Sequence, residues 1–106
     1  MKTGIELIAE ERQKQIEKEG WTMEHDIFEH QYGQLADAAV SYALTEEERK
    51  KLCHLAKADE EVTPTWPFEK EHWKPCPNDR IKELVKAGAL IAAEIDRLQN
   101  EKVTKI

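Results

Sequence analysis

The last third of the chain contains one long segment with helical hydrophobic periodicity, and this segment limits the possible folds most. Between residues 79 and 101, apolar residues recur at spacings of three and four: Ile81, Leu84, Val85, Gly88, Ile91, Ala92, Ile95 and Leu98. Such spacing places them on one face of an α-helix, where we expect Leu84, Ile91 and Ile95 to form the core. Asn78 is the expected N-cap, with Asp79 in the first turn.

The predicted length of this helix also suggests a partner. At 1.5 Å per residue it would measure roughly 35 Å, which is more than a monomer of 106 residues easily covers. Apolar helix surface that the chain itself cannot cover is normally buried against a second chain. We therefore expect a homodimer or a higher homo-oligomer.

Three further helices are expected before this one. Residues 4–20 have helical composition with Gly20 as a stop, and residues 34–44 place Leu35, Ala38, Ala39 and Tyr42 on one face. Thr45 and Glu48 form a capping-box pattern, which predicts that a short peripheral helix begins at residue 46. Residues 21–33 are expected to connect the first two helices as a loop. No strand alternation is present, so the predicted fold is all-α, a bundle of about four helices in one domain spanning residues 1–106.

A long loop rich in tryptophan and proline is expected before the last helix. Residues 58–78 contain all four prolines, together with Trp66, Phe68 and Trp73. The favoured interpretation is that the tryptophans plug the end of the helix bundle, because large aromatic side chains anchor loops well. The alternative is a lid over a ligand, since long ordered loops are often functional.

Charge and cysteine usage exclude several classes of function. The chain has 22 acidic and 16 basic residues and a formal charge of −6, which disfavours nucleic-acid polymers and anionic membranes as partners. It has no apolar run of the roughly 20 residues that cross a bilayer, and no apolar signal segment. Cys53 and Cys76 do not form a CxxC pair and are expected to be free thiols. These features predict a cytoplasmic protein.

Charged residues at helical spacing are the candidates for chemistry. Carboxylates projected from two facing helices can hold a hard divalent cation. The spaced candidates are Glu6, Glu10 and Glu11 on the first helix and Asp37, three residues after Gln34, on the second. Lys86 lies in the most apolar part of the last helix, which favours a buried partner or an anionic ligand. The alternative is a solvated acidic surface with local ion pairs, such as Glu94 with Arg97.

Three blocks of sequence carry a resemblance to a known family: IELIAEERQKQIEKEGWTMEHD, GQLADAAVSYA and DRIKELVKAGALIAAEIDRL, the last preceded by the WP and HWKP signals. With these blocks the chain resembles a family of small phage and bacterial proteins related to the MazG-like, all-α nucleoside triphosphate pyrophosphatases. The resemblance covers most of the chain, with residues 46–65 the least matched. It implies a dimeric or tetrameric helical bundle that uses Mg²⁺ to cleave a nucleoside triphosphate into the monophosphate and pyrophosphate.

The acidic motifs of that superfamily are matched only in part. Its Glu-Glu-x-x-Glu motif aligns with Glu10 and Glu11, but Lys14 replaces the last glutamate. Its Glu-x-x-Asp motif aligns with Gln34 and Asp37, so an amide replaces the first carboxylate. Because lost anionic ligands weaken the attraction for Mg²⁺, either other carboxylates such as Glu6, Glu83 or Glu94 contribute, or the protein binds nucleotides without efficient hydrolysis.

The residues and the resemblance together predict a Mg²⁺-dependent nucleoside triphosphate pyrophosphohydrolase. Its expected metal ligands are Glu10, Glu11, Asp37 and Glu94. Its expected catalytic residues are Glu11, Lys86 and Arg12. The residues expected to contact the nucleotide are Trp21, Trp66, Trp73 and Lys86. A metal-bound water would attack phosphorus while a lysine or arginine offsets the developing charge. Two alternatives remain: a phage or prophage protein that binds or sequesters a nucleotide, and a non-catalytic helical interaction module.

Overall fold

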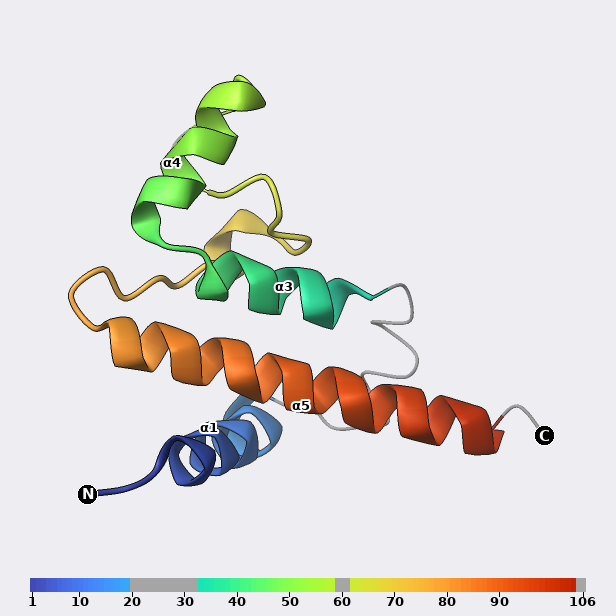
Figure 1. The fold of residues 1–106 in the computed structure, drawn as a ribbon. Coiled ribbons are helices and arrows are strands. Elements are labelled where there is room, and N and C mark those ends of the chain that lie inside the picture. The colour runs from blue at the N-terminus through green and yellow to red at the C-terminus, as the bar shows by residue number, and fades with distance from the viewer. Residues whose placement is uncertain (20–32, 59–61, 105–106) are drawn as a thin grey trace.

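A computed structural model of the chain describes residues 1–19, 33–58 and 62–104. These ranges contain four α-helices and a single-turn 3-10 helix, η1, and no strand (Figure 1). The α-helices are α1 (Gly4–Glu19), α3 (Gln34–Ala43), α4 (Glu46–Leu55) and α5 (Arg80–Thr104), and η1 spans Lys70–His72. The all-α prediction is confirmed. The expected stop at Gly20 and the loop of residues 21–32 lie outside the described residues.

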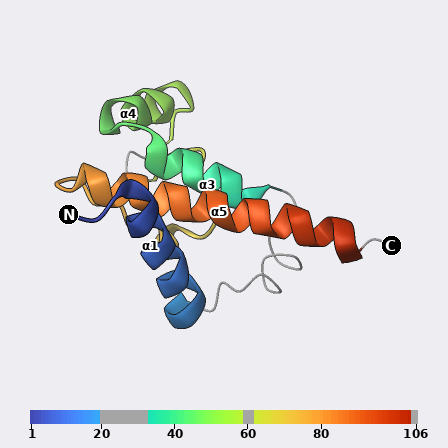
Figure 2. The ribbon, with the colours of Figure 1, turned by 60° about the horizontal axis from the view of Figure 1, so that its bottom comes forward.

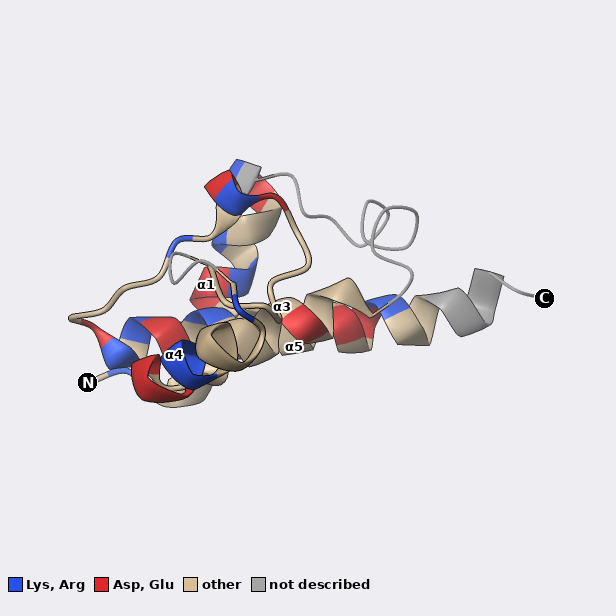
Figure 3. Ribbon diagram, turned by 90° about the horizontal axis from the view of Figure 1, so that it is seen from above, with Lys and Arg blue, Asp and Glu red and all other residues tan. Residues whose placement is uncertain are grey.

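Helix α5 is the central element of the fold. It runs the width of the molecule, with α3 packed on one side and α1 crossing it on the other (Figures 1 and 2). Helix α4 lies beyond α3 and away from α5, as expected for a peripheral helix. Seen from above, α4 carries charges of both signs, whereas α3 is largely uncharged (Figure 3). Within the described ranges, no helix has both the length and the apolar character that a bilayer crossing requires.

The core lies between α3, α5 and the loop that precedes α5. Its buried members are Leu35, Ala38, Ala39, Tyr42, Trp66, Ala87, Leu90 and Ala93, and Val62, Phe68 and Trp73 pack against them. The Tyr42 ring meets Trp66 edge-on, with centroids 5.6 Å apart, and Trp73 with centroids 4.7 Å apart. The alanines let the two helix backbones approach closely. This packing confirms that Trp66 and Trp73 plug the end of the helix assembly.

The buried face of α5 differs from the predicted one. Leu84, Ile91, Ile95 and Leu98 are between 46% and 51% exposed, and Ile81 is 67% exposed, so the expectation that this side forms the core of the chain is wrong. The buried face instead combines small or apolar residues with charged ones: Glu83, Ala87, Leu90, Ala93, Glu94 and Arg97. Alanines fit the closely packed α3, and the charged residues are buried because each has an opposite charge beside it.

Helix starts follow local hydrogen-bonding rules. The Thr45 hydroxyl accepts a hydrogen bond from the Glu48 N–H at 3.2 Å, which confirms the predicted start of α4. Asp79 Oδ1 accepts from the Lys82 N–H at 3.0 Å, and α5 begins at Arg80. The N-cap of α5 is therefore Asp79 and not Asn78, because the carboxylate that reaches the third N–H of the helix belongs to Asp79.

A buried charged cluster joins the end of α3 to α4 and α5. The guanidinium of Arg49 donates to the carbonyls of Ser41 and Tyr42, each at 2.9 Å, and to Glu83 Oε2 at 3.0 Å. Arg80 donates to the carbonyls of Tyr42, Ala43 and Leu44 and to Glu83 Oε1. The last carbonyls of a helix have no partners within the helix, so the two arginines satisfy them.

Glu83 stays ionised at the centre of this cluster. It is only 4% exposed, and Cys76 also donates its N–H to Oε2 at 3.1 Å. Burial by itself raises the pKa of the Glu83 carboxyl, but hydrogen bonds from Arg49, Cys76 and Arg80 outweigh burial and hold that pKa below its usual value. Glu83, considered above as a further carboxylate ligand, is therefore the centre of a buried ion cluster.

Helix α1 crosses α5 at Gly88. A Cβ atom added to Gly88 would lie 2.8 Å from Ile8 Cγ1 and nearer still to Ile8 Cδ1, which is closer than real Cβ contacts allow. The absence of a side chain at this position therefore lets Ile8 rest on the α5 backbone. This contact sets the position of the next turns of α1, which carry Glu11 and Gln15.

Candidate ligand-binding site

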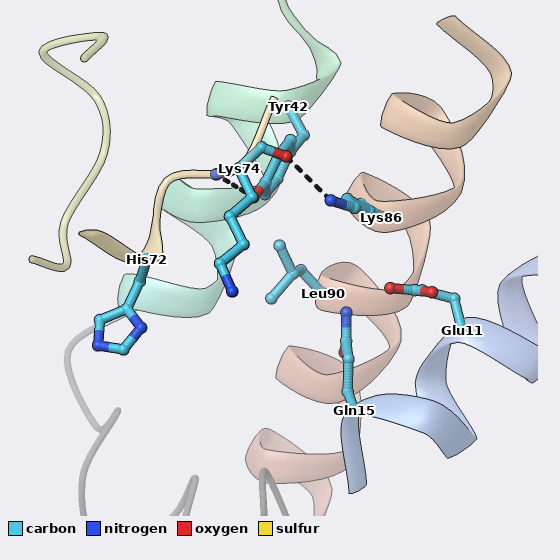
Figure 4. Close-up of a pocket in the computed structure, with 7 residues that line it drawn as sticks. All are labelled: Glu11, Gln15, Tyr42, His72, Lys74, Lys86 and Leu90. Carbon is cyan, nitrogen blue, oxygen red and sulfur yellow. Dashed lines mark hydrogen bonds between the residues drawn. The ribbon is translucent and has the colours of Figure 1, made fainter. Parts of the chain in front are cut away.

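A cavity of about 290 Å³ opens between α1, α3, α5 and the segment that follows η1 (Figure 4). Helix α1 supplies Glu11 and Gln15, α3 supplies Tyr42, α5 supplies Lys86 and Leu90, and His72 and Lys74 come from η1 and the residues after it. Small-molecule sites measure roughly 300–1,000 Å³, so this cavity suits a ligand at the small end of that range.

One wall of the cavity is positively charged. Lys86 donates a hydrogen bond to the Lys74 carbonyl at 2.9 Å, and its ammonium lies 5.4 Å from the centroid of the Tyr42 ring. The Lys74 N–H donates to the Tyr42 hydroxyl at 3.2 Å, so these three residues hold one another in place. Figure 4 shows the Lys74 ammonium extending from the loop toward the side of Leu90. The two lysines therefore make a local positive site on an acidic protein.

Neither lysine of this wall forms an ion pair with a described residue. Lys2, Lys50 and Lys51 form ion pairs with glutamates, whereas no described carboxylate lies within ion-pair distance of Lys74 or Lys86. An ammonium group carries three N–H donors, and Lys86 uses one on the Lys74 carbonyl. The remaining donors can bind an anion that enters the cavity.

The opposite wall is formed by two neighbouring side chains of α1. Glu11 and Gln15 are one helical turn apart, and both side chains point from α1 toward Leu90 (Figure 4). They lie across the cavity from the two lysines. Gln15 is only 3% exposed, yet its Oε1 has no hydrogen-bond partner among the described residues. A buried polar atom without a partner costs about 1–3 kcal/mol, so native proteins rarely keep one without a functional or structural reason.

The structure brings together some of the predicted site residues and separates others. Glu11 and Lys86 both line the cavity. Glu10 is exposed and pairs with Lys2 at 2.6 Å, and Asp37 is exposed on α3. Glu94 is buried but accepts a hydrogen bond from Arg97, as the local ion-pair alternative predicts.

The carboxylates of the described residues do not assemble into a metal site. Within residues 1–19, 33–58 and 62–104, no group of three or more His, Cys, Asp or Glu side chains is arranged to hold an ion. Of the four expected metal ligands, Glu11 is the one at the cavity. Mg²⁺ prefers oxygen ligands, and Glu11 is the single described carboxylate that the cavity offers to such an ion.

The expected nucleotide contacts are also distributed differently. Trp66 is buried in the core and donates its Nε1–H to the Glu69 carbonyl at 3.0 Å, and neither it nor Trp73 lines the cavity. Arg12 is buried on α1 and does not line the cavity, and Trp21 lies outside the described residues. Their roles in catalysis or base stacking remain predictions.

Four residues that line the cavity are not predicted as site residues: Gln15, His72, Lys74 and Leu90. A fifth, Tyr42, is expected from the sequence only as a core residue. Gln15 could have been predicted from the sequence, because it follows Glu11 by four residues and shares its helix face. His72 and Lys74 have none, because they come from an irregular segment whose path periodicity does not reveal.

Comparison with known proteins does not add a family assignment: no family model, curated protein or solved structure matches this chain. The function is therefore inferred from the chemistry of the cavity, together with the resemblance carried by the three sequence blocks.

Proposed function

We propose that the protein binds a nucleotide, with a phosphate group against Lys74 and Lys86. The observation that carries this proposal is the pair of lysines at one wall of a small cavity, without a described carboxylate at ion-pair distance from either. Lysine binds phosphate as a point charge, and a hydrogen bond to a charged group contributes about 1.5–3 kcal/mol. An anion there would replace the water that otherwise solvates these ammonium groups.

The rest of the cavity suits the organic part of a nucleotide. Leu90 and the Tyr42 ring supply apolar surface, and Glu11 and Gln15 supply hydrogen-bonding groups at the far wall. Ligand sites commonly combine such apolar lining with a few well-placed polar groups. A free inorganic anion would leave most of this lining unused.

Hydrolysis of a nucleoside triphosphate is the second candidate function, and the position of Glu11 favours it. This carboxylate lies across the cavity from the two lysines, where it could orient an attacking water while the ammonium groups offset charge on phosphate. The Mg²⁺ requirement comes from the resemblance alone. Among the described residues, Glu11 is the carboxylate that would contribute to holding this ion together with the phosphates of the substrate.

Calorimetric titration with nucleoside mono- and triphosphates, in Mg²⁺ and separately in EDTA, tests both candidates. We expect Lys86→Met to weaken binding by about 10-fold or more, as loss of a charge-assisted hydrogen bond predicts. Lys50→Met is the matched control, because Lys50 is exposed on α4 and paired with Glu46. Release of monophosphate and pyrophosphate, measured after separation of the products, distinguishes turnover from binding. Wild-type protein that binds none of these nucleotides would refute the proposal and leave a helical interaction module.

We further propose that the protein is a homodimer through the exposed stripe of α5, defined as Ile81, Leu84, Ile91, Ile95 and Leu98. The stripe contains no charged residue, so only another apolar surface matches it, and an identical stripe on a second copy does so by two-fold symmetry. Helix α3 packs on a different face of α5. Helix α1 crosses the stripe's own face at Gly88, but the five stripe residues remain 46–67% exposed around this crossing.

Sedimentation velocity over a range of concentrations tests this interface. Ile95→Glu should convert the dimer into a monomer, because it would bury a charge at the centre of an apolar contact. Leu55→Glu, at an exposed residue of α4, is the control and should leave the mass unchanged. A monomeric wild-type protein at the highest concentration would exclude the dimer.

A further inference from the structure

The wall of α1 that faces the lysines contains a carboxylate beside a buried carboxamide. Glu11 offers only acceptors when ionised, whereas the Gln15 carboxamide offers both an acceptor and N–H donors. Gln15 Oε1 is without a hydrogen-bond partner in the described part of the chain, and Figure 4 shows the amide nitrogen directed toward Leu90. Rotation of the carboxamide exchanges the two atoms, so either can face the cavity. This wall can therefore bind a ligand that presents at least one hydrogen-bond donor to it.

We propose that Gln15 and Glu11 select a nucleobase that has an exocyclic amino group next to an acceptor ring nitrogen. An amino group carries two N–H donors, so it can serve Gln15 Oε1 and a Glu11 oxygen together, whereas a ring N–H can serve only one of them. The Gln15 N–H can then donate to the neighbouring ring nitrogen. Paired donor and acceptor contacts of this kind are how glutamine recognises adenine.

This chemistry defines the class of ligand that fits the cavity. Adenine and cytosine both present an amino group beside an unprotonated ring nitrogen. Hypoxanthine and uracil present a carbonyl oxygen at the same position. A rotated Gln15 can donate to that oxygen and accept from the neighbouring ring N–H, but the oxygen then faces the Glu11 carboxylate, and two acceptors repel each other. The inference rests on the proposed nucleotide binding, with phosphate at Lys74 and Lys86 and the base edge at α1.

The burial of Gln15 supplies a second, independent expectation. In the absence of a ligand, Oε1 is removed from water without a compensating hydrogen bond, which destabilises the folded protein. Gln15→Met keeps the approximate shape of the side chain and removes the unpaired atoms. If Gln15 serves ligand recognition and not stability, its replacement should therefore stabilise the ligand-free protein.

The experiment compares matched nucleotides on three proteins: wild type, Gln15→Met and Gln13→Met. Gln13 lies on the same helix and is exposed, where it donates to Glu17 at 2.8 Å, so its replacement is the control. Calorimetry with AMP and IMP, and with CMP and UMP, should show tighter binding of the amino member of each pair by about 10-fold or more in wild type. Gln15→Met should abolish this preference and raise the melting temperature of the ligand-free protein, and Gln13→Met should do neither.

The possible failures are distinguishable from one another. If AMP and IMP bind equally well, the base-selection inference is wrong while nucleotide binding stands. If Gln15→Met lowers the melting temperature and retains the preference, Gln15 is a structural residue and the inference is equally wrong. If neither these four nucleotides nor their triphosphates bind, both this inference and the proposed function are overturned.

Discussion

The crossing of α1 over α5 gives the sharpest test of how this fold builds its cavity. Gly88→Ala adds one methyl group at a position where the new Cβ would lie 2.8 Å from Ile8 Cγ1 and even closer to Ile8 Cδ1. Ile8 is β-branched and stiff at its first torsion, so it cannot move aside freely. Helix α1 has to shift away from α5 to accommodate the methyl group.

Two opposing contributions decide the size of the effect. Alanine is more favourable than glycine inside a helix by about 1 kcal/mol, while overpacking costs about 1–3 kcal/mol. The net expectation for Gly88→Ala is a destabilisation of about 1 kcal/mol. For a chain of this size that corresponds to a fall in melting temperature of about 4–8 °C.

The reasoning is tested by a double-mutant cycle with Ile8→Ala. In that background the clash is absent, so Gly88→Ala should become stabilising by about 1 kcal/mol through helix propensity alone. Urea unfolding followed by circular dichroism measures all four proteins. If Gly88→Ala stabilises the protein equally with Ile8 and with Ala at position 8, the close contact does not govern this crossing. Because α1 also carries Glu11 and Gln15, the single variant should weaken nucleotide binding as well.

Two further predictions concern the charged cluster and the start of α4. Glu83→Gln should cost about 3 kcal/mol at neutral pH, because it breaks a buried ion pair with Arg49. Because the pKa of Glu83 is lowered in the folded protein, the ionised carboxylate stabilises the fold fully above the usual pKa of a glutamate, and this stabilisation is lost as the pH falls through the lower, folded-state pKa. Urea unfolding should therefore show the free energies of unfolding of wild type and Glu83→Gln converging in acid. A difference between them that grows in acid would contradict this. Thr45→Ala should lower the free energy of unfolding by about 1 kcal/mol, because it removes the cap on the Glu48 N–H. Thr45→Ser keeps a hydroxyl at this position and should retain most of the wild-type stability. Equal losses in the two variants would show that the hydroxyl does not cap α4.

Much of the local structure is predictable from sequence because it depends on neighbours in the chain. The helical ranges follow from composition and spacing, the Thr45 cap from residues three apart, and the Trp66 plug from aromatic residues in a proline-rich loop. The predicted start of α5 is wrong by one residue, because Asn78 and Asp79 are both good caps and only the backbone path decides between them.

The candidate site is predictable only in part. Glu11 and Lys86 stand out in the sequence because of their charge and their places on their helices, and both line the cavity. Their neighbours Lys74 and His72 come from a segment without periodicity. Glu10 and Asp37 point elsewhere because residues next to one another on a helix face different directions, and spacing alone does not say which direction meets another helix.

The amino-acid sequence by itself determined that the chain forms helices, roughly where they begin and end, and that one of them is long. Only the tertiary structure decided which side of α5 is buried. Apolar residues recur on one face of that helix, but the buried face is the one that fits the alanines of α3 and carries partners for its own charges. The physical reason is that burial depends on the surface a helix meets, and α3 accepts small residues and paired ions more closely than it would accept a row of isoleucines.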